Sequence, residues 1–277
     1  MPDRDARRNK MNAQQLAQAG RLSESLARLQ DEVRANPGDE KLRVFLFQLL
    51  SVMGRWDRAI TQLGVLAGMS ADATMLARIF QPVVQCEVLR EEIFAGRRTP
   101  LIFGQPDEWM GLLIRANEMT ARGNGAAAAE LRAQALEAAP ATPGTVNGTT
   151  FEWIADADQR LGPLLEVILD GKYYWIPFHR IRRINIEKPS DMRDLVWIPA
   201  QFVWANGGEG SGHVPSRYPQ TERSSDDALR LARKTEWSGV EGGLSVGLGQ
   251  RILATDTDDF PLLECGIIDL QPAETVR

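Results

Sequence analysis

Three carboxylates in one short stretch are the residues that could most readily do chemistry. Asp156 and Asp158 stand two positions apart, and Glu166 follows in a predicted strand. Such a set could bind a hard cation through oxygen ligands, or divide into an acid and a base. Aspartates in turns also accept hydrogen bonds from backbone amides, and Arg160 is close enough in sequence to pair with them. We expect the second, structural role and keep a metal-dependent enzyme as an alternative.

A serine-hydrolase pattern, G-x-S-x-G, occurs at residues 243–247 without the context that the chemistry needs. The nucleophile of such enzymes sits on a strand-to-helix turn and is followed by an acid and a histidine. Here Ser245 precedes further glycines, and the only histidines, His179 and His213, come earlier in the chain. A phosphate-binding loop also lacks support, because no lysine follows in the loop and the next segment is strand-like. We predict a glycine-rich loop between strands, no catalytic residue and no histidine-rich metal site.

Composition and charge exclude several classes of protein. With 43% hydrophobic and 25% charged residues, the 277-residue chain has the make-up of a soluble globular protein. Its formal net charge of −5 argues against a nucleic-acid partner. Residues 1–10 hold no apolar stretch and no segment approaches a membrane span, so we expect neither a secretion signal nor a membrane partner. We expect Cys86 and Cys265 to be reduced thiols in the cytoplasm, and we expect no cofactor.

The first half of the chain repeats with the spacing of amphipathic helices. Gly20 and Gly54 lie 34 positions apart and open similar phrases, and Gly123 opens a third. This is the tetratricopeptide (TPR) period, in which helices pack in pairs and a small residue lets them approach closely. Residues 72–95 are predicted to form one long helix, capped by Asp72, as a decayed repeat.

The second half alternates with the period of strands. Asp170-Gly171 between two alternating runs favours a type I′ turn, which predicts a β-hairpin within residues 164–186. The prolines of two Trp-Ile-Pro triplets, Pro177 and Pro199, are interpreted as bends that curl the sheet into a small barrel. The polar residues 206–227 are predicted to be a long loop.

Together these patterns predict an α+β fold. A TPR-like helical repeat domain is expected over residues 1–140, followed by a small, mostly antiparallel, barrel-like β domain over residues 141–277. The joint is the run of proline, glycine and Asn-Gly between Pro140 and Thr150. We expect no strand before Pro140.

Stacked helix pairs leave a concave surface that can bind an amphipathic helix. Setting the three glycines at the same repeat position places six residues on this concave side: Val44, Gln48, Ser51, Leu113, Asn117 and Thr120.

Aromatic residues of the strand half offer a second kind of surface. Alternation turns about half of them inward, and any on the outer face would be candidates for an interface. The candidates are Tyr173, Tyr174, Trp197 and Trp204. A β-domain scaffold that dimerises through such residues is therefore the second alternative.

Several motifs in both halves resemble one known family. They are residues 151–177 (FEWIADADQRLGPLLEVILDGKYYWIP), residues 193–197 (RDLVW), Arg217-Tyr218-Pro219, Thr235-Glu236-Trp237, Gly249-Gln250-Arg251, and residues 103–106 (FGQP) with Trp109. Together they resemble the ImpE family, also called TagJ or SciE, accessory proteins encoded with bacterial type VI secretion systems.

The resemblance implies a non-enzymatic cytoplasmic adaptor without catalytic residues. Members are similar in binding the N-terminal helix of the small contractile-sheath subunit, and they are linked to the ClpV ATPase that recycles contracted sheath. The motifs do not place the helix-binding surface on this sequence.

Overall fold

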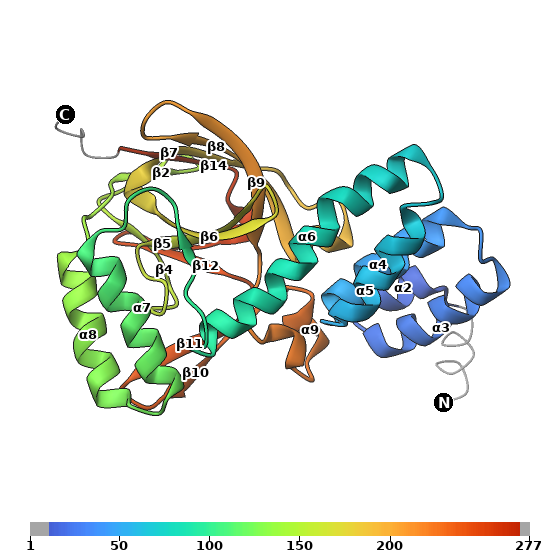
Figure 1. Cartoon of the computed structure of the whole chain (residues 1–277), viewed down its shortest axis with the longest axis horizontal. Coiled ribbons are helices and arrows are strands. Elements are labelled where there is room, and N and C mark those ends of the chain that lie inside the picture. The colour runs from blue at the N-terminus through green and yellow to red at the C-terminus, as the bar shows by residue number, and fades with distance from the viewer. Residues whose placement is uncertain (1–10, 272–277) are drawn as a thin grey trace.

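Helices occupy the first half of the chain and strands the second in the computed structural model, which describes residues 11–271. The helices are α2 (Ala13–Gln18), α3 (Leu22–Ala35), α4 (Glu40–Val52), α5 (Trp56–Leu66), α6 (Ala71–Phe94), α7 (Glu108–Ala121), α8 (Gly125–Ala138) and α9 (Asp227–Arg230). Figure 1 shows α2 to α5 at one end of the molecule, the strands with α7 and α8 at the other, and α6 running between them. The predicted α+β class is confirmed. Within the described part, no helix is both long and apolar enough to cross a membrane.

The same type of glycine turn connects the two helices in each of three helix pairs. Gly20, Gly54 and Gly123 follow α2, α4 and α7 with φ of 71°, 65° and 77°. In each turn the next residue's N–H reaches back to the last helical turn: Arg21 to Leu16, Arg55 to Leu50, and Asn124 to Met119. This is the Schellman motif, which favours glycine because of its positive φ. The repeated glycine therefore marks helix ends, and the predicted close helix approach is wrong for Gly20 and Gly123, whose surroundings are open. The TPR assignment stays a prediction.

One helix start and one strand differ from expectation. Helix α6 is capped by Ser70, whose hydroxyl accepts from the N–H of Ala73 at 3.1 Å, and not by Asp72. A two-residue strand, β1 (Leu101–Ile102), pairs in parallel with residues 174 and 175, so the prediction of no strand before Pro140 is wrong. This stretch reaches the sheet because it connects two helices that both lie beside it (Figure 1).

The remaining strands form three sheets. They are β2 (Gly144–Val146), β3 (Thr149–Phe151), β4 (Ile154–Asp156), β5 (Leu164–Leu169), β6 (Lys172–Pro177), β7 (Ile181–Ile186), β8 (Trp197–Trp204), β9 (Glu209–Pro215), β10 (Thr235–Val240), β11 (Leu244–Gly249), β12 (Ile252–Thr255), β13 (Asp259–Pro261) and β14 (Ile267–Leu270). The nine-stranded sheet has the order β1-β6-β5-β9-β8-β7-β14-β2-β3, beside a β10-β11 pair and a β13-β12-β4 sheet. All pairs except β1–β6 are antiparallel.

The predicted hairpin is confirmed as β5–β6. Asp170 and Gly171 both have positive φ, 48° and 70°, and connect the paired residues Leu169 and Lys172. Every residue of β5 is buried, because the strand has a core on each face. Leu165 and Val167 belong to the core inside the curled sheet, and Ile168 to the core under the helices.

The helices and the sheet share the larger core. It combines helical residues such as Phe47 and Phe80 with Tyr173, Trp175 and Trp197 from the strands. The second core lies within the curl of the nine-stranded sheet, between β5–β6 and β7–β8 (Figure 1). The division into domains at residue 140 stays a prediction, because the larger core spans that boundary.

Two segments predicted as loops contain strands. Residues 206–227 contain β9, and residues 243–247 lie largely in β11. At two of their glycines other atoms come close: a Cβ at Gly212 would lie 2.5 Å from the carbonyl oxygen of Ile168, and one at Gly247 would lie 2.3 Å from the ring of Tyr218. At these two positions glycine therefore reflects close packing between strands.

Candidate functional site

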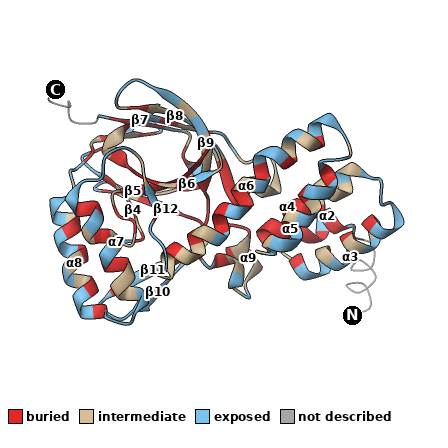
Figure 2. Ribbon diagram, viewed as in Figure 1, coloured by how far each residue is buried: buried red, intermediate tan, exposed pale blue. Residues whose placement is uncertain are grey.

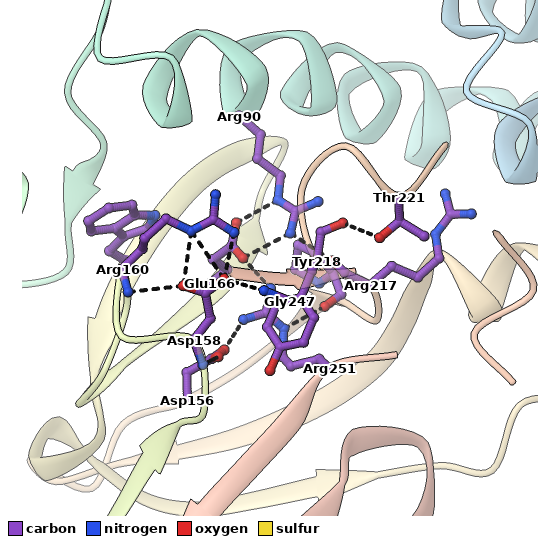
Figure 3. Close-up of polar contacts among 12 residues, drawn as sticks. Arg90, Asp156, Asp158, Arg160, Glu166, Arg217, Tyr218, Thr221, Gly247 and Arg251 are labelled. Atoms are coloured by element: carbon purple, nitrogen blue, oxygen red, sulfur yellow. Dashed lines mark hydrogen bonds and ion pairs between the residues drawn. The ribbon is translucent and has the colours of Figure 1, made fainter. Parts of the chain in front are cut away.

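A buried ionic network lies where helix α6 meets the strands, centred on Glu166 of β5 (Figure 3). Arg90 of α6 binds it at two points, Nε to Oε1 at 2.6 Å and Nη2 to Oε2 at 2.9 Å. Arg251, just before β12, pairs with both Glu166 and Asp156. All four side chains are at least 95% buried. Each of these buried carboxyl groups therefore has a guanidinium beside it, which is the condition for burying ionisable groups.

Hydrogen bonds complete the surroundings of Glu166. The hydroxyl of Tyr173 donates to Glu166, and the indole N–H of Trp175 donates to the Tyr173 oxygen at 2.8 Å. Burial alone would raise the pKa of Glu166, but the charges of Arg90 and Arg251, with hydrogen bonds from Arg90 and Tyr173, lower that pKa to about 2. Glu166 is therefore ionised and fully occupied as an acceptor.

Asp156 lies in a less balanced position. Burial raises its pKa to about 7, and the nearby Asp158 and Glu166 carboxylates add to the rise, against the attraction of Arg251. Asp156 accepts the backbone N–H of Asp158 at 2.8 Å. Asp158 in turn pairs with Arg160 at 2.5 Å and accepts the N–H of Gly247 at 3.1 Å. These contacts are the structural role expected of the two aspartates, with backbone amides and Arg160 as partners.

The network ties distant segments to α6. Arg90 donates to the carbonyl of Arg217 at 2.7 Å, and Arg217 donates to the carbonyl of Val52 at the end of α4, at 2.9 Å. The indole of Trp197 on β8 donates to Glu87 of α6 at 2.7 Å. Every carboxylate of the set considered as an alternative metal site thus faces an arginine, and no group of three or more His, Cys, Asp or Glu suited to a metal occurs within residues 11–271.

Sequence reasoning found Arg160 but missed Arg90, Arg217 and Arg251. Arg217 and Arg251 lie in two short motifs quoted for the family resemblance, Arg217-Tyr218-Pro219 and Gly249-Gln250-Arg251. The first of them holds α4 and the second holds β4 and β5. Those motifs were the available signal, and the structure gives both arginines a structural role.

The predicted helix-binding residues fall into two separate groups. Val44 and Gln48 line a hollow of about 430 Å³ formed by α2, α3, α4 and Asp191. Ser51, one turn further along α4, is fully buried and donates to the carbonyl of Phe47 at 2.9 Å. Gln48 is also largely committed, because its amide donates to Asp191 at 3.1 Å and accepts the N–H of Met192 at 3.2 Å.

The second group lies on α7, beside the strands and away from α4 (Figure 1). Leu113 is fully buried, and Asn117 donates to the carbonyl of Arg160 at 2.7 Å. Thr120 is partly exposed and accepts from Arg132 of α8 at 2.9 Å. The six residues therefore do not form one concave surface, because α6 places the third helix pair far from the first two.

The predicted interface aromatics are mostly internal. Tyr173 and Trp197 are fully buried, and Trp204 stacks on Phe202 with ring centroids 5.0 Å apart. Tyr174 is only partly exposed. Tyr173 and Trp197 cannot form an exposed interface, because helices cover the face of the sheet on which they lie, and Trp204 lies in the core within the curled sheet. The exposed indoles are instead Trp153 and Trp237.

The remaining polar candidates are isolated. His179 is partly exposed and 3.6 Å from Asp107. His213 is packed edge-on against Phe80, and burial lowers its pKa to about 4. Cys86 and Cys265 are free and buried, and burial raises the pKa of each thiol to about 12. None of these groups is poised as a nucleophile or base.

Comparison with known proteins identifies the family to which this chain is similar. The family described as ImpE protein matches residues 148–269. The type VI secretion system accessory component TagJ of Pseudomonas aeruginosa is 47% identical over 264 residues, 95% of this chain and 92% of that protein. A crystal structure of a Vibrio parahaemolyticus protein superposes with a TM-score of 0.85 at 25% identity, covering 94% of this chain and 97% of that one. With nearly half of its residues shared along almost its whole length, the chain belongs to the ImpE/TagJ family.

Proposed function

We propose that this protein is a non-enzymatic, cytoplasmic accessory component of a bacterial type VI secretion system. It captures the N-terminal helix of the small contractile-sheath subunit and links the sheath to the ClpV ATPase. The observation that carries this proposal is the 47% identity, over 95% of the chain, to a protein named as an accessory component of that system.

The hollow beside α4 is the surface we assign to the partner helix. Leu42, Val44 and Phe45 are partly buried apolar residues there, and Glu32, Glu40 and Lys41 surround them. An amphipathic helix binds such a hollow by inserting apolar side chains while its polar face meets the charged rim. Val44 and Gln48 stay in the proposed site, and the buried Ser51 and Leu113 leave it.

The occupied carboxylates support a role without catalysis. Glu166, Asp156 and Asp158 each bind an arginine and are at least 98% buried. A general acid or base must reach its substrate, and these groups reach only other side chains and backbone amides.

The test is a calorimetric titration of the full chain with a synthetic peptide of the sheath subunit's N-terminal helix. We expect binding by the unaltered protein and a loss of about tenfold or more in affinity for Val44→Glu, which places a charge in the apolar hollow. Val65→Glu is the matched control, because Val65 is 41% exposed on α5 and does not line the hollow. ClpV is then added to the peptide-free and peptide-bound protein to measure the link.

The outcomes separate the parts of the proposal. Absence of peptide binding by the unaltered protein would refute the sheath partner. Equal affinities for Val44→Glu and Val65→Glu would refute the hollow as the site and leave the partner in place.

A further inference from the structure

Strand β10 belongs to a two-stranded ribbon and is the strand on the side away from the body of the protein. Within the part of the chain that the structure describes, it pairs with β11 alone. Residues 236–240 are exposed, and Figure 2 shows the ribbon at the lower margin of the molecule, below α7. Trp237, from one of the short motifs that the proposed function does not explain, is 43% exposed.

The register shows which backbone groups of β10 point outward. The N–H of Gln250 donates to the carbonyl of Lys234 at 3.0 Å, and β10 pairs with β11 in continuous antiparallel register from Thr235 to Val240. Hydrogen-bonded and non-hydrogen-bonded pairs alternate along such a ladder. The even-numbered residues therefore bond to β11, and the N–H and C=O groups of Thr235, Trp237 and Gly239 face away from it.

The opposite edge of the ribbon is bonded to the body of the protein at Gly247 and Gly249. The N–H of Gly247 donates to Asp158 at 3.1 Å, and the N–H of Gly249 donates to Thr221 at 2.9 Å. The carbonyl of Gly249 accepts the N–H of Tyr218 at 3.0 Å. The ribbon is thus fixed to the body through β11, while the backbone groups on the free edge of β10 find no partner among residues 11–271.

We propose that β10 pairs with β10 of a second copy of this chain. An antiparallel pair with its two-fold axis at Trp237 sets Thr235 opposite Gly239, so that each outward donor meets an outward acceptor. It also makes the two exposed indoles neighbours, and cross-strand aromatic pairs stabilise a sheet. Moving the axis to residue 236 would set Glu236 against its own copy, which is unfavourable for like charges, and moving it to residue 238 would set Trp237 opposite Gly239 in place of the indole pair. The product is a continuous four-stranded sheet across two subunits.

We assign a second copy of the chain to the free edge of β10 because this edge is complementary to itself. An unprotected edge strand is a template for another strand, and six residues without proline or bulge leave this one open. A strand of identical sequence satisfies both edges at once, because the interface is isologous.

The test compares two substitutions at Gly239 by sedimentation over a range of protein concentrations. A Cβ added there meets nothing within 4 Å. Gly239→Ala keeps the outward N–H, and Gly239→Pro removes it without removing a bond to β11. We expect a dimer for the unaltered protein and for Gly239→Ala, and dimerisation weakened about tenfold or more for Gly239→Pro, which loses one bond from each copy.

Amide hydrogen exchange gives an independent reading on the unaltered chain. The amides of Trp237 and Gly239 should be protected at high protein concentration and exchange quickly on dilution, while the even-numbered amides of β10 stay protected at both. This measurement stands even when Gly239→Pro does not fold. A monomer at every concentration, or a dimer of Gly239→Pro as tight as that of Gly239→Ala, would overturn the proposal.

Discussion

Arg90 on α6 and Glu166 on β5 form a two-point ion pair, with Nε to Oε1 at 2.6 Å and Nη2 to Oε2 at 2.9 Å, between residues 76 positions apart. The parallel geometry is the strongest that arginine and a carboxylate can adopt. Because both groups are buried, water cannot take the place of either one when it is removed, and the remaining group is left without that partner. The pair therefore fixes the long helix on the sheet, and with it the position of α4 that carries the proposed helix-binding hollow.

Removal of this arginine should be costly. Arg90→Met leaves Glu166 buried with only one of its two guanidinium partners, and we expect the free energy of unfolding to fall by about 3–5 kcal/mol. Urea denaturation monitored by tryptophan fluorescence measures it. Arg34→Met is the control, because Arg34 pairs with Asp31 on the surface of α3 with side chains 72% and 65% exposed. Similar losses for the two variants would contradict the central role of Arg90.

The raised pKa of Asp156, about 7, makes stability depend on pH. A carboxyl with a higher pKa in the folded state holds its proton there after the same carboxyl in the unfolded chain, with its ordinary pKa of 3.8, has lost it. Its contribution to stability is therefore complete below about pH 4 and is lost as pH rises to about 7. Between pH 5 and 8, the unaltered protein should lose about 2–3 kcal/mol relative to Asp156→Asn, which cannot titrate.

Denaturation curves of both proteins across that range give the difference directly. Titrating groups distant from Asp156 are common to the two proteins and cancel in the comparison. A pH-independent difference would mean that Asp156 is ionised throughout, as a simple partner of Arg251.

Most helices and the β5–β6 hairpin could be predicted from local patterns in the sequence. Three- and four-residue spacing located the helices, and Asp170-Gly171 located the β5–β6 turn, because both signals depend on neighbouring residues. The repeated position of Gly20 and Gly54 also has a local cause, because each glycine ends a helix. Its interpretation as close packing required knowledge of what surrounds each glycine.

Contacts between distant segments were beyond such patterns. Nothing local indicates that Glu166 meets Arg90 and Arg251 rather than a metal ion. Alternation predicted that about half of the aromatics face outward, yet Trp197 is buried because α6 covers that face of the sheet. Strand β9 was predicted as a loop because its glycines resemble turn residues. They are in fact required by the close approach of residues on neighbouring strands.

The two echoing glycines should differ in what they tolerate. Both have positive φ, so alanine at either position is strained by about 1–2 kcal/mol. At Gly20 the nearest atom to an added Cβ is the end of the Arg233 side chain at 3.7 Å, whereas at Gly54 it is Cγ of Glu222 at 2.3 Å. We expect Gly54→Ala to lower the free energy of unfolding clearly more than Gly20→Ala. Equal losses in urea denaturation would show that Glu222 moves aside freely.

Gln48 and Val44 lie one turn apart on α4, and their substitutions should separate stability from binding. The Gln48 amide holds Asp191 and the N–H of Met192, where the 3-10 helix η2 (Met192–Leu195) begins. Gln48→Ala leaves these groups without a partner at a largely buried position, so we expect a loss of about 1–3 kcal/mol in the free energy of unfolding. Val44→Ala removes two methyl groups from a partly exposed side chain, so it should change stability little and weaken binding of the partner helix.

Thermal denaturation and the peptide titration, run on the same two variants, distinguish these effects. Gln48→Ala should lower the melting temperature by several degrees, while Val44→Ala should keep it. Affinity for the peptide should fall for Val44→Ala because the hollow loses apolar contact where the helix inserts. If Val44→Ala instead melts early and binds normally, its side chain serves the packing of α4 against α2 and α3, and the partner helix lies elsewhere on the protein.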